Sequence, residues 1–191
     1  MIGIGIGGYR LLWAPNFMPE KTVYVYIDRQ KDFEDLCTQL KDSAACLHIK
    51  NFKQLAKILK YPSNMKTGRY AVTPGMNNLS LLRNLRRGQQ ATTRITFNNI
   101  RLKTDLAERI SEQLMFDKDE LSQLLNDSSY CASLGFTTGT IMALFIPNTY
   151  EVYWNISAEN FMQRMLREYK AFWTEQRLEK AAKTGLSPIE I

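Results

Sequence analysis

The sequence predicts an α+β fold, because short segments typical of strands alternate along the chain with longer segments of helical periodicity. Residues 22–28 and 92–98 are rich in β-branched and aromatic residues and alternate as half-buried strands do. Residues 157–185 instead place apolar side chains at the spacing of a helical core face. With 191 residues, 45% of them apolar, the chain can form one or two domains with a core and is not expected to be disordered.

The N-terminal segment, residues 1–14, is apolar for about a dozen residues apart from Arg10. It is shorter than the roughly 20 residues that span a bilayer, and it lacks the basic start and cleavage site of a signal peptide. Two interpretations stay open. The segment is the outer end of an anchor helix, with Tyr9 and Trp13 suited to a membrane interface, or it is a short glycine-rich buried strand.

The following stretch, up to about residue 90, is expected to hold three helices and two strands. After the strand at 22–28, helical spacing recurs in residues 31–42 and again in residues 48–61, where Pro62 ends the helix. A short strand and a Pro-Gly turn occupy residues 68–76. Residues 77–88 then read as a helix with asparagine at its N-cap and glycine at its end.

Near residues 91–101 the mixed pattern of strands and helices gives way to a mainly helical pattern. Two helices in series are predicted within residues 104–127, the first capped by Thr104 and the second by Asp117, with Glu120 completing a capping box. Residues 128–140 are predicted to be a loop and residues 141–147 a strand leading into a turn.

The last segment predicted is a single long helix from Ser157 to Gly185, preceded by a strand at residues 150–153. Ser187 and Pro188 have the composition of a further helix start. Because this start lies so close to Ile191, the sequence is interpreted as the truncated part of a longer chain.

Charge is distributed unevenly along the sequence. Residues 43–104 contain twelve Lys and Arg and no Asp or Glu, while the other 13 basic and 19 acidic residues give the rest of the chain a net charge of −6. Such a block favours an anionic partner, and a solvated face without a specific ligand is the alternative. Nucleic acid is not the expected partner, because no recognition signature accompanies the block. The predicted polyanion-binding residues are Arg83, Arg86 and Arg87.

Few residues point to catalysis or metal binding. The three cysteines, Cys37, Cys46 and Cys131, match no zinc spacing and are expected to be buried thiols, and His48 is the only histidine. No phosphate-binding loop is present, so neither a cofactor nor a metal is predicted. Glu151 lies among apolar and aromatic neighbours that can keep a general acid protonated. The favoured interpretation is nevertheless a solvent-facing residue on a strand.

Several segments in a fixed order resemble the YceG-like family, the endolytic murein transglycosylases of MltG type, and most closely its Bacteroidetes branch. The most specific pieces are Gly68-x-Tyr70 followed by a helix and Arg86-x-Gly88, and the motif Pro147 to Tyr150. The resemblance extends over nearly the whole chain. It implies an anchor remnant at 1–14, a LysM-like module at 19–90 and an incomplete α+β catalytic domain at 91–191.

The resemblance also implies an activity and a location. Such enzymes cleave nascent peptidoglycan glycan strands at MurNAc–GlcNAc bonds without water and leave 1,6-anhydroMurNAc ends. A single-pass inner-membrane protein facing the periplasm is therefore expected, with peptidoglycan strands and peptidoglycan synthases as partners.

The sequence departs from the family at the catalytic position. The family's catalytic glutamate follows the G-L-[ST]-P segment, and Glu190 does not match it, so no catalytic residue is assigned and the chain alone is expected to be inactive. Asn148, Thr149 and Tyr150 match the family motif near the cleft and are predicted sugar contacts. Alternatively, Pro147, Asn148 and Thr149 form a turn and Tyr150 packs into the fold. The alternative function is a non-catalytic module that binds the cell wall or a polyanion.

Overall fold

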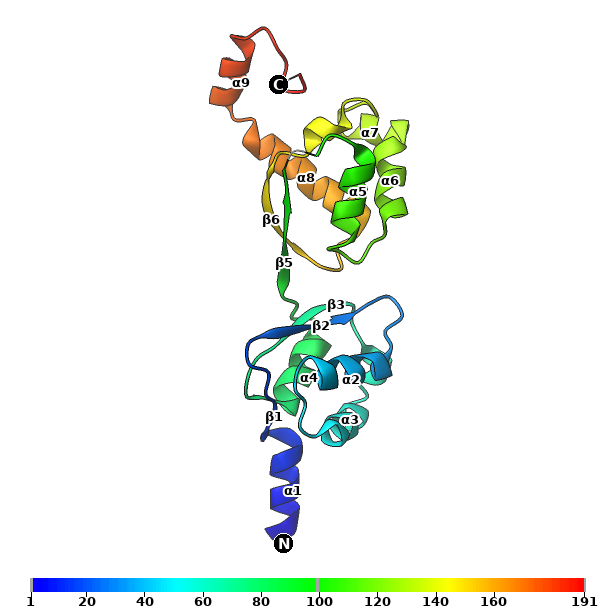
Figure 1. Ribbon diagram of the computed structural model, residues 1–191, viewed down its shortest axis with the longest axis vertical. Coiled ribbons are helices and arrows are strands. Elements are labelled where there is room, and N and C mark those ends of the chain that lie inside the picture. Colours follow the sequence, from blue (N-terminus) through cyan, green and yellow to red (C-terminus); the bar gives the residue numbers. More distant parts are fainter. Residues whose placement is uncertain (1, 99, 191) are drawn as a thin grey trace. The chain divides into compact units, whose positions relative to one another are not determined.

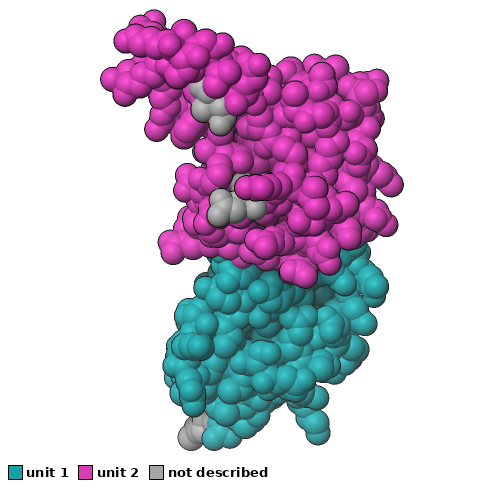
Figure 2. All heavy atoms as spheres, turned by 45° about the horizontal axis from the view of Figure 1, so that its top comes forward, with its two compact units in different colours: residues 1–92 teal, residues 93–191 magenta. Residues whose placement is uncertain are grey.

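The computed structural model describes residues 2–98 and 100–190, with only the backbone given for residues 2–6 and 97. The chain divides into two compact units, Met1–Thr92 and Thr93–Ile191, which Figure 2 shows in different colours. Helices mix with small two-stranded sheets in both units (Figure 1). The predicted α+β class is therefore confirmed.

Unit 1 packs three amphipathic helices against two short sheets. Its helices after the N-terminal one are α2 (Phe33–Asp42), α3 (Ile49–Ile58) and α4 (Asn78–Arg87), with a 3-10 turn at Pro62–Asn64. Its strands are β1 (Pro15–Phe17), β2 (Val23–Ile27), β3 (Gly68–Val72) and β4 (Met76–Asn77). β2 pairs antiparallel with β3, and β1 pairs with β4. Alternation turns Val25, Ile27, Tyr70 and Val72 into the core, where they meet the apolar faces of the helices.

Local sequence signals set both ends of α4 as predicted, whereas α3 ends at Ile58, before the predicted stop at Pro62. Asn77 caps α4 by accepting a hydrogen bond from the amide of Ser80. Gly88 ends the helix with φ of 73°, a left-handed conformation that glycine adopts at little cost.

The N-terminal segment forms helix α1 (Ile2–Leu12), so the buried-strand interpretation is wrong. Its C-terminal end packs against α3 and α4, with Leu11 and Leu12 touching the core of unit 1. None of the described helices combines the length and the hydropathy needed to cross a membrane.

A buried pair of asparagines joins α1 to the rest of unit 1. The Asn16 amide donates to Asn78 Oδ1 at 2.7 Å, and the Asn78 amide donates to the Leu11 carbonyl at 2.9 Å. Asn16 Oδ1 accepts from the backbone amide of His48 at 2.7 Å. Because both asparagines are almost fully buried, these bonds hold β1, α3, α4 and the end of α1 in one arrangement.

Unit 2 is built from helices around one strand pair. Its helices are α5 (Lys103–Ser111), α6 (Lys118–Asn126), α7 (Ser128–Ser133), α8 (Ala158–Phe172) and α9 (Glu175–Ala182), with a 3-10 turn at Ile141–Leu144. Strand β5 (Thr92–Phe97) pairs with β6 (Asn148–Tyr153). The core centres on Phe161, whose ring lies 5.8 Å from that of Phe116 and 6.3 Å from that of Phe145.

The structure corrects two predicted elements in the middle of unit 2. The stretch predicted to be a loop contains α7, which begins where Asp127 caps the amides of Ser129 and Tyr130. The stretch predicted to be a strand is a 3-10 turn that buries Ile141 and Leu144, three residues apart. A four-residue apolar run does not distinguish these conformations by pattern alone.

Two predictions about helix ends are also wrong. α5 begins at Lys103 with Leu102 at the N-cap position, and Thr104 instead bonds the Asp105 carboxylate. The long helix predicted from Ser157 is two helices, because Trp173 leaves helical geometry and Thr174 caps α9. The capping box of Asp117 and Glu120 and the Ser157 cap are confirmed.

Candidate functional site

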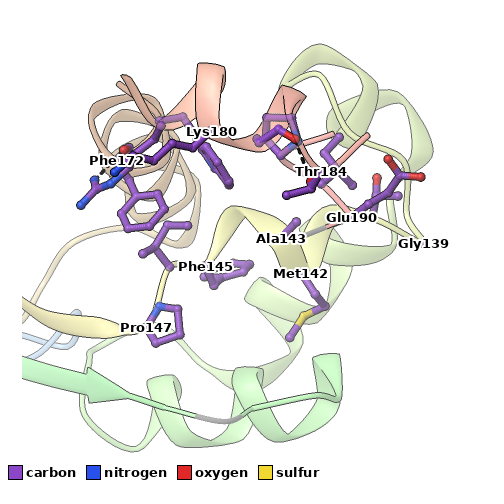
Figure 3. Close-up of a pocket in the computed structure, with 16 residues that line it drawn as sticks. Gly139, Met142, Ala143, Phe145, Pro147, Phe172, Lys180, Thr184 and Glu190 are labelled. Atoms are coloured by element: carbon purple, nitrogen blue, oxygen red, sulfur yellow. Dashed lines mark hydrogen bonds between the residues drawn. The ribbon is translucent and has the colours of Figure 1, made fainter. Parts of the chain in front are cut away.

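A pocket of about 820 Å³ opens in unit 2 where α8 gives way to α9. Its size lies within the range of pockets that hold small ligands. One wall comes from the 3-10 turn and the residues that lead into β6, and the opposite wall from the end of α8, α9 and the following segment (Figure 3). Its lining comprises Gly139, Thr140, Met142, Ala143, Phe145, Ile146, Pro147, Phe172, Trp173, Arg177, Lys180, Ala181, Thr184, Pro188, Ile189 and Glu190.

The floor of the pocket is apolar and supported by the core. Phe145 stacks on the buried ring of Phe161, which fixes its position. Trp173 packs edge-to-face against Phe172 with ring centroids 5.4 Å apart. The Trp173 indole Nε1 is buried and has no hydrogen-bond partner among the described residues. A buried donor of this kind is costly unless a ligand or water accepts from it.

Two cations on α9 line one side of the pocket. The Arg177 guanidinium lies 4.1 Å from the centre of the Phe172 ring, and its Nη1 donates to the Phe172 carbonyl at 2.6 Å. Lys180 follows one helical turn later and also lines the pocket. The stacking and the hydrogen bond hold the guanidinium at the rim while other N–H groups remain free to bind an anion.

A carboxylate lies on the other side of the pocket. Glu190 Oε2 accepts from the Ser187 backbone amide at 2.8 Å and from the Ser187 hydroxyl at 2.6 Å. These hydrogen bonds favour the charged form and lower the pKa of Glu190 below its usual value. Figure 3 shows Lys180 and Glu190 on opposite sides, with Ala143 between them and Phe145 below Lys180. The predicted helix after Ser187 can be followed only through this single turn.

The predicted sugar contacts lie beside the pocket rather than in its lining. Pro147 lines it, but the next three residues enter β6. Asn148 and Thr149 are exposed, and the Thr149 hydroxyl bonds that of Thr96 at 2.8 Å. Tyr150 is buried and its hydroxyl donates to the Ile146 carbonyl at 2.5 Å, which is the packing alternative for this residue. A contact with sugar remains a prediction for all three.

Glu151 lies on the exposed face of β6, as the favoured interpretation had it. Its carboxylate forms an ion pair with Arg94 Nε of β5 at 2.9 Å, and both side chains are largely exposed. Glu151 is therefore a surface residue of the strand pair and does not lie in an apolar cavity that would keep its carboxyl group protonated.

The three predicted polyanion-binding residues all lie on α4 of unit 1. Arg83, Arg86 and Arg87 are exposed, and none of them has an ion-pair partner among the residues that the structure describes. Arg86 and Arg87 occupy the last turn, where the helix dipole favours positive charge. The arrangement presents a small cationic surface.

The three cysteines and the histidine lie outside the lining of the pocket. Cys37 and Cys131 are buried and Cys46 is half-buried, and burial raises the pKa of the Cys37 thiol to about 11. His48 is exposed at the start of α3. No group of three or more His, Cys, Asp or Glu side chains suited to a metal ion occurs in the described part of the chain.

Sequence reasoning missed the pocket residues on α9 and the turn that shapes it. Arg177 and Lys180 fell within the single helix predicted from Ser157 to Gly185, so nothing set them apart as pocket residues. The usable signal was Thr174 followed three residues later by Arg177, because a threonine within an apolar helical pattern can cap a new helix and break the old one.

The fold and the site together define an α+β protein of two units, one with a ligand-sized pocket and one with a cationic helix. The sequence model of the YceG-like family matches residues 25–191, and the chain belongs to this family, as the resemblance predicted. No curated protein matches the sequence. Among solved structures, a YceG-like protein from Listeria monocytogenes is similar, with 19% identity and a TM-score of 0.48. The similarity covers 88% of this chain, which spans 60% of the length of that protein.

Proposed function

We propose that the chain is part of an endolytic peptidoglycan transglycosylase that cleaves glycan strands at MurNAc–GlcNAc bonds and leaves 1,6-anhydroMurNAc ends. Membership of the YceG-like family supports this proposal. The observation that carries it is the ligand-sized pocket beside the family's Pro147 to Tyr150 motif, with Phe145, Ile146 and Pro147 in its wall. A glycan strand that leaves the pocket past Pro147 would meet the exposed side chains of Asn148 and Thr149.

The chemistry requires one carboxylic acid that changes role during the reaction. As an acid it protonates the glycosidic oxygen while the bond from the anomeric carbon to that oxygen breaks. As a base it then takes the proton of the 6-hydroxyl, whose oxygen forms the new bond to the anomeric carbon. The carboxylic acid is regenerated, and no water is consumed.

The two carboxylates nearest the motif and the pocket do not suit this role. Glu151 is exposed and paired with Arg94, and Glu190 is held in its charged form by Ser187. We therefore propose that the 191 residues contribute binding surfaces and do not cleave glycan by themselves.

Product analysis tests the proposed reaction. Purified peptidoglycan sacculi are incubated with the complete product of the gene, and the released muropeptides are examined by mass spectrometry. Ends lacking the mass of one water, as in 1,6-anhydroMurNAc, are the expected product. Reducing ends only, or no new ends, would contradict the proposed lytic reaction.

We also propose that unit 1 is a LysM-like module on the periplasmic side of the inner membrane, near peptidoglycan synthases. The apolar helix α1 leading into unit 1 motivates this location. Fractionation of cells that express the complete gene product is the test. Recovery in the membrane fraction, with unit 1 cut by protease only after the outer barrier is opened, is expected. Recovery in the soluble cytoplasmic fraction would refute the location.

A second candidate function, a non-catalytic module that binds the wall or another polyanion, is favoured by the exposed arginines of α4. If they bind anionic groups, reversing Arg86→Glu and Arg87→Glu should weaken binding to sacculi and flatten its dependence on salt. Reversal of two exposed cations on α8, Arg167→Glu and Lys170→Glu, changes the net charge equally and serves as the control. Equal salt dependence of both double variants would remove this candidate.

A further inference from the structure

The pocket of unit 2 separates opposite charges by an apolar floor. Arg177 and Lys180 contribute positive charge from α9, and Glu190 contributes negative charge from the segment after it. In Figure 3, Ala143 lies between Lys180 and Glu190, and Phe145 lies below Lys180. A glycan strand by itself has no pair of opposite charges to match this pattern.

We propose that this pocket binds a short peptide that carries a free carboxylate and, an apolar span away, a free amine. The carboxylate lies against Arg177 and Lys180, and the amine lies against Glu190. This inference rests on the proposed function, and the peptide it names is the stem peptide of a peptidoglycan strand.

The carboxylate end is prepared by the position of Arg177. Stacking on Phe172 and the bond from Nη1 to the Phe172 carbonyl already hold the guanidinium at the rim. Its Nε and Nη2 groups still have N–H donors to offer, and a planar fork of this kind fits a carboxylate. Because the side chain is already ordered, binding loses little of its conformational entropy.

The amine end is prepared by the turn at Ser187. Both hydrogen bonds from Ser187 go to Oε2 of Glu190. Within the described part of the chain, Oε1 receives no hydrogen bond and remains available to an ammonium group. The carboxylate is thus oriented without being neutralised, because Ser187 supplies dipoles and no charge.

The middle of the pocket suits a peptide backbone with small apolar side chains. Its volume of about 820 Å³ accommodates several residues. The buried Trp173 Nε1 lacks a partner among the described residues, and a peptide carbonyl provides the acceptor it lacks. Met142, Ala143 and Phe145 provide the apolar contact on the floor.

A consequence concerns cross-linking of the wall. Forming a cross-link converts the amine of a stem peptide into an amide, which carries no positive charge. The pocket then loses its ion pair at Glu190, so it favours peptides that are not yet cross-linked.

Calorimetric titration with synthetic peptides tests the inference without any glycan. The ligand is a stem tetrapeptide with a free diamino-acid amine and a free C-terminal carboxylate. Two analogues have the amine acetylated or the C-terminus amidated. Each modification is expected to weaken binding to the 191-residue chain about tenfold, the effect of losing one charged hydrogen bond.

Two variants assign the two ends of the peptide. Glu190→Gln should lose about tenfold in affinity and no longer distinguish the free from the acetylated amine, while still distinguishing the free carboxylate from the amide. Arg177→Gln should show the opposite pattern. Arg167→Gln on α8 and Glu179→Gln on the exposed surface of α9 are matched controls that should bind as the unmodified chain does.

Equal binding of the three peptides, no binding at all, or the same loss in the control variants would overturn the inference. The titration contains no glycosidic bond, so its failure does not bear on the cleavage proposed above. Conversely, sacculi that yield no anhydro ends would defeat the cleavage and leave the measured peptide affinity in place.

Discussion

Both units have an apolar core, but they present different surfaces to a binding partner. In unit 1 the core closes around Phe52 and Tyr70, the buried asparagines Asn16 and Asn78 are hydrogen-bonded to each other, and charge is presented on the outside of α4. In unit 2 the core ends at a pocket whose floor includes Phe145. The difference teaches that unit 1 offers a charged surface, whereas unit 2 offers a shaped cavity.

The largest expected effects come from the aromatic centres of the two cores. Phe52→Ala in unit 1 and Phe161→Ala in unit 2 each remove a fully buried ring and should cost about 3–5 kcal/mol of unfolding free energy. Only Phe161 supports a pocket residue, through its stack on Phe145. Chemical denaturation measures the loss, and peptide titration should show weaker binding for the unit 2 variant alone. Equal binding losses in both would break the comparison.

A smaller effect is expected from the buried amides of unit 1. Asn78→Ala removes the acceptor at 2.7 Å for the Asn16 amide, which keeps only its longer bonds to the His48 carbonyl and Cys46 Sγ, and it removes the donor to the Leu11 carbonyl. The expected loss is about 1–3 kcal/mol in urea denaturation. Asn84→Ala, on the same helix, is the matched control and should change little. A loss for Asn78→Ala no greater than that of the control would show that the pair does not hold unit 1 together.

Helix caps should contribute about equally in the two units. Asp117→Ala breaks the capping box of α6 in unit 2, and Gly88→Ala forces an L-residue into a left-handed conformation in unit 1. Each should cost about 1 kcal/mol, measured as a change in the denaturation midpoint. Lys118→Ala, at the first position of α6, leaves the box intact and serves as the control. A cost of more than about 3 kcal/mol for either cap variant would mean that the residue does more than end a helix.

The last expected effect concerns the stability of unit 1 at alkaline pH, and it is absent at neutral pH. Burial raises the pKa of Cys37 from 9.0 to about 11 and that of Tyr70 from 10.0 to about 12. A group whose pKa is higher in the folded state contributes its full stabilisation at pH values below its pKa in the unfolded state. This contribution is lost as the pH rises through the pKa of the folded state. Unit 1 should therefore lose stability progressively above about pH 9 and up to about pH 12. Thermal unfolding followed by amide signals of unit 1 measures this, and a flat profile over that window would contradict the burial of these groups.

Local signals in the sequence predicted those parts of the fold that depend on neighbours in the chain. Asn77, Gly88 and Ser157 were identified at helix ends because each satisfies backbone groups within three or four residues. The alternation of residues 22–28 predicted β2, because side chains on a strand point to opposite faces in turn. Such signals need no knowledge of the rest of the fold.

The pocket depended on contacts that no local pattern contains. The residues at Ile141–Leu144 adopt a 3-10 turn because of packing against α8, and their apolar run fits a strand equally well. Arg177 reaches the pocket only because the helix breaks at Trp173. The predicted motif reaches the pocket only through Pro147, and the burial of Tyr150 is a consequence of tertiary packing.

Binding to the cell wall is the claim shared by the enzyme and the binding module. Sedimentation of the 191-residue chain with purified sacculi at moderate salt tests it most directly. The chain is predicted to appear in the pellet, to be displaced by soluble muropeptides through the pocket, and to be released in part by high salt through loss of contacts to α4. A chain that remains in the supernatant at every salt concentration would contradict the account.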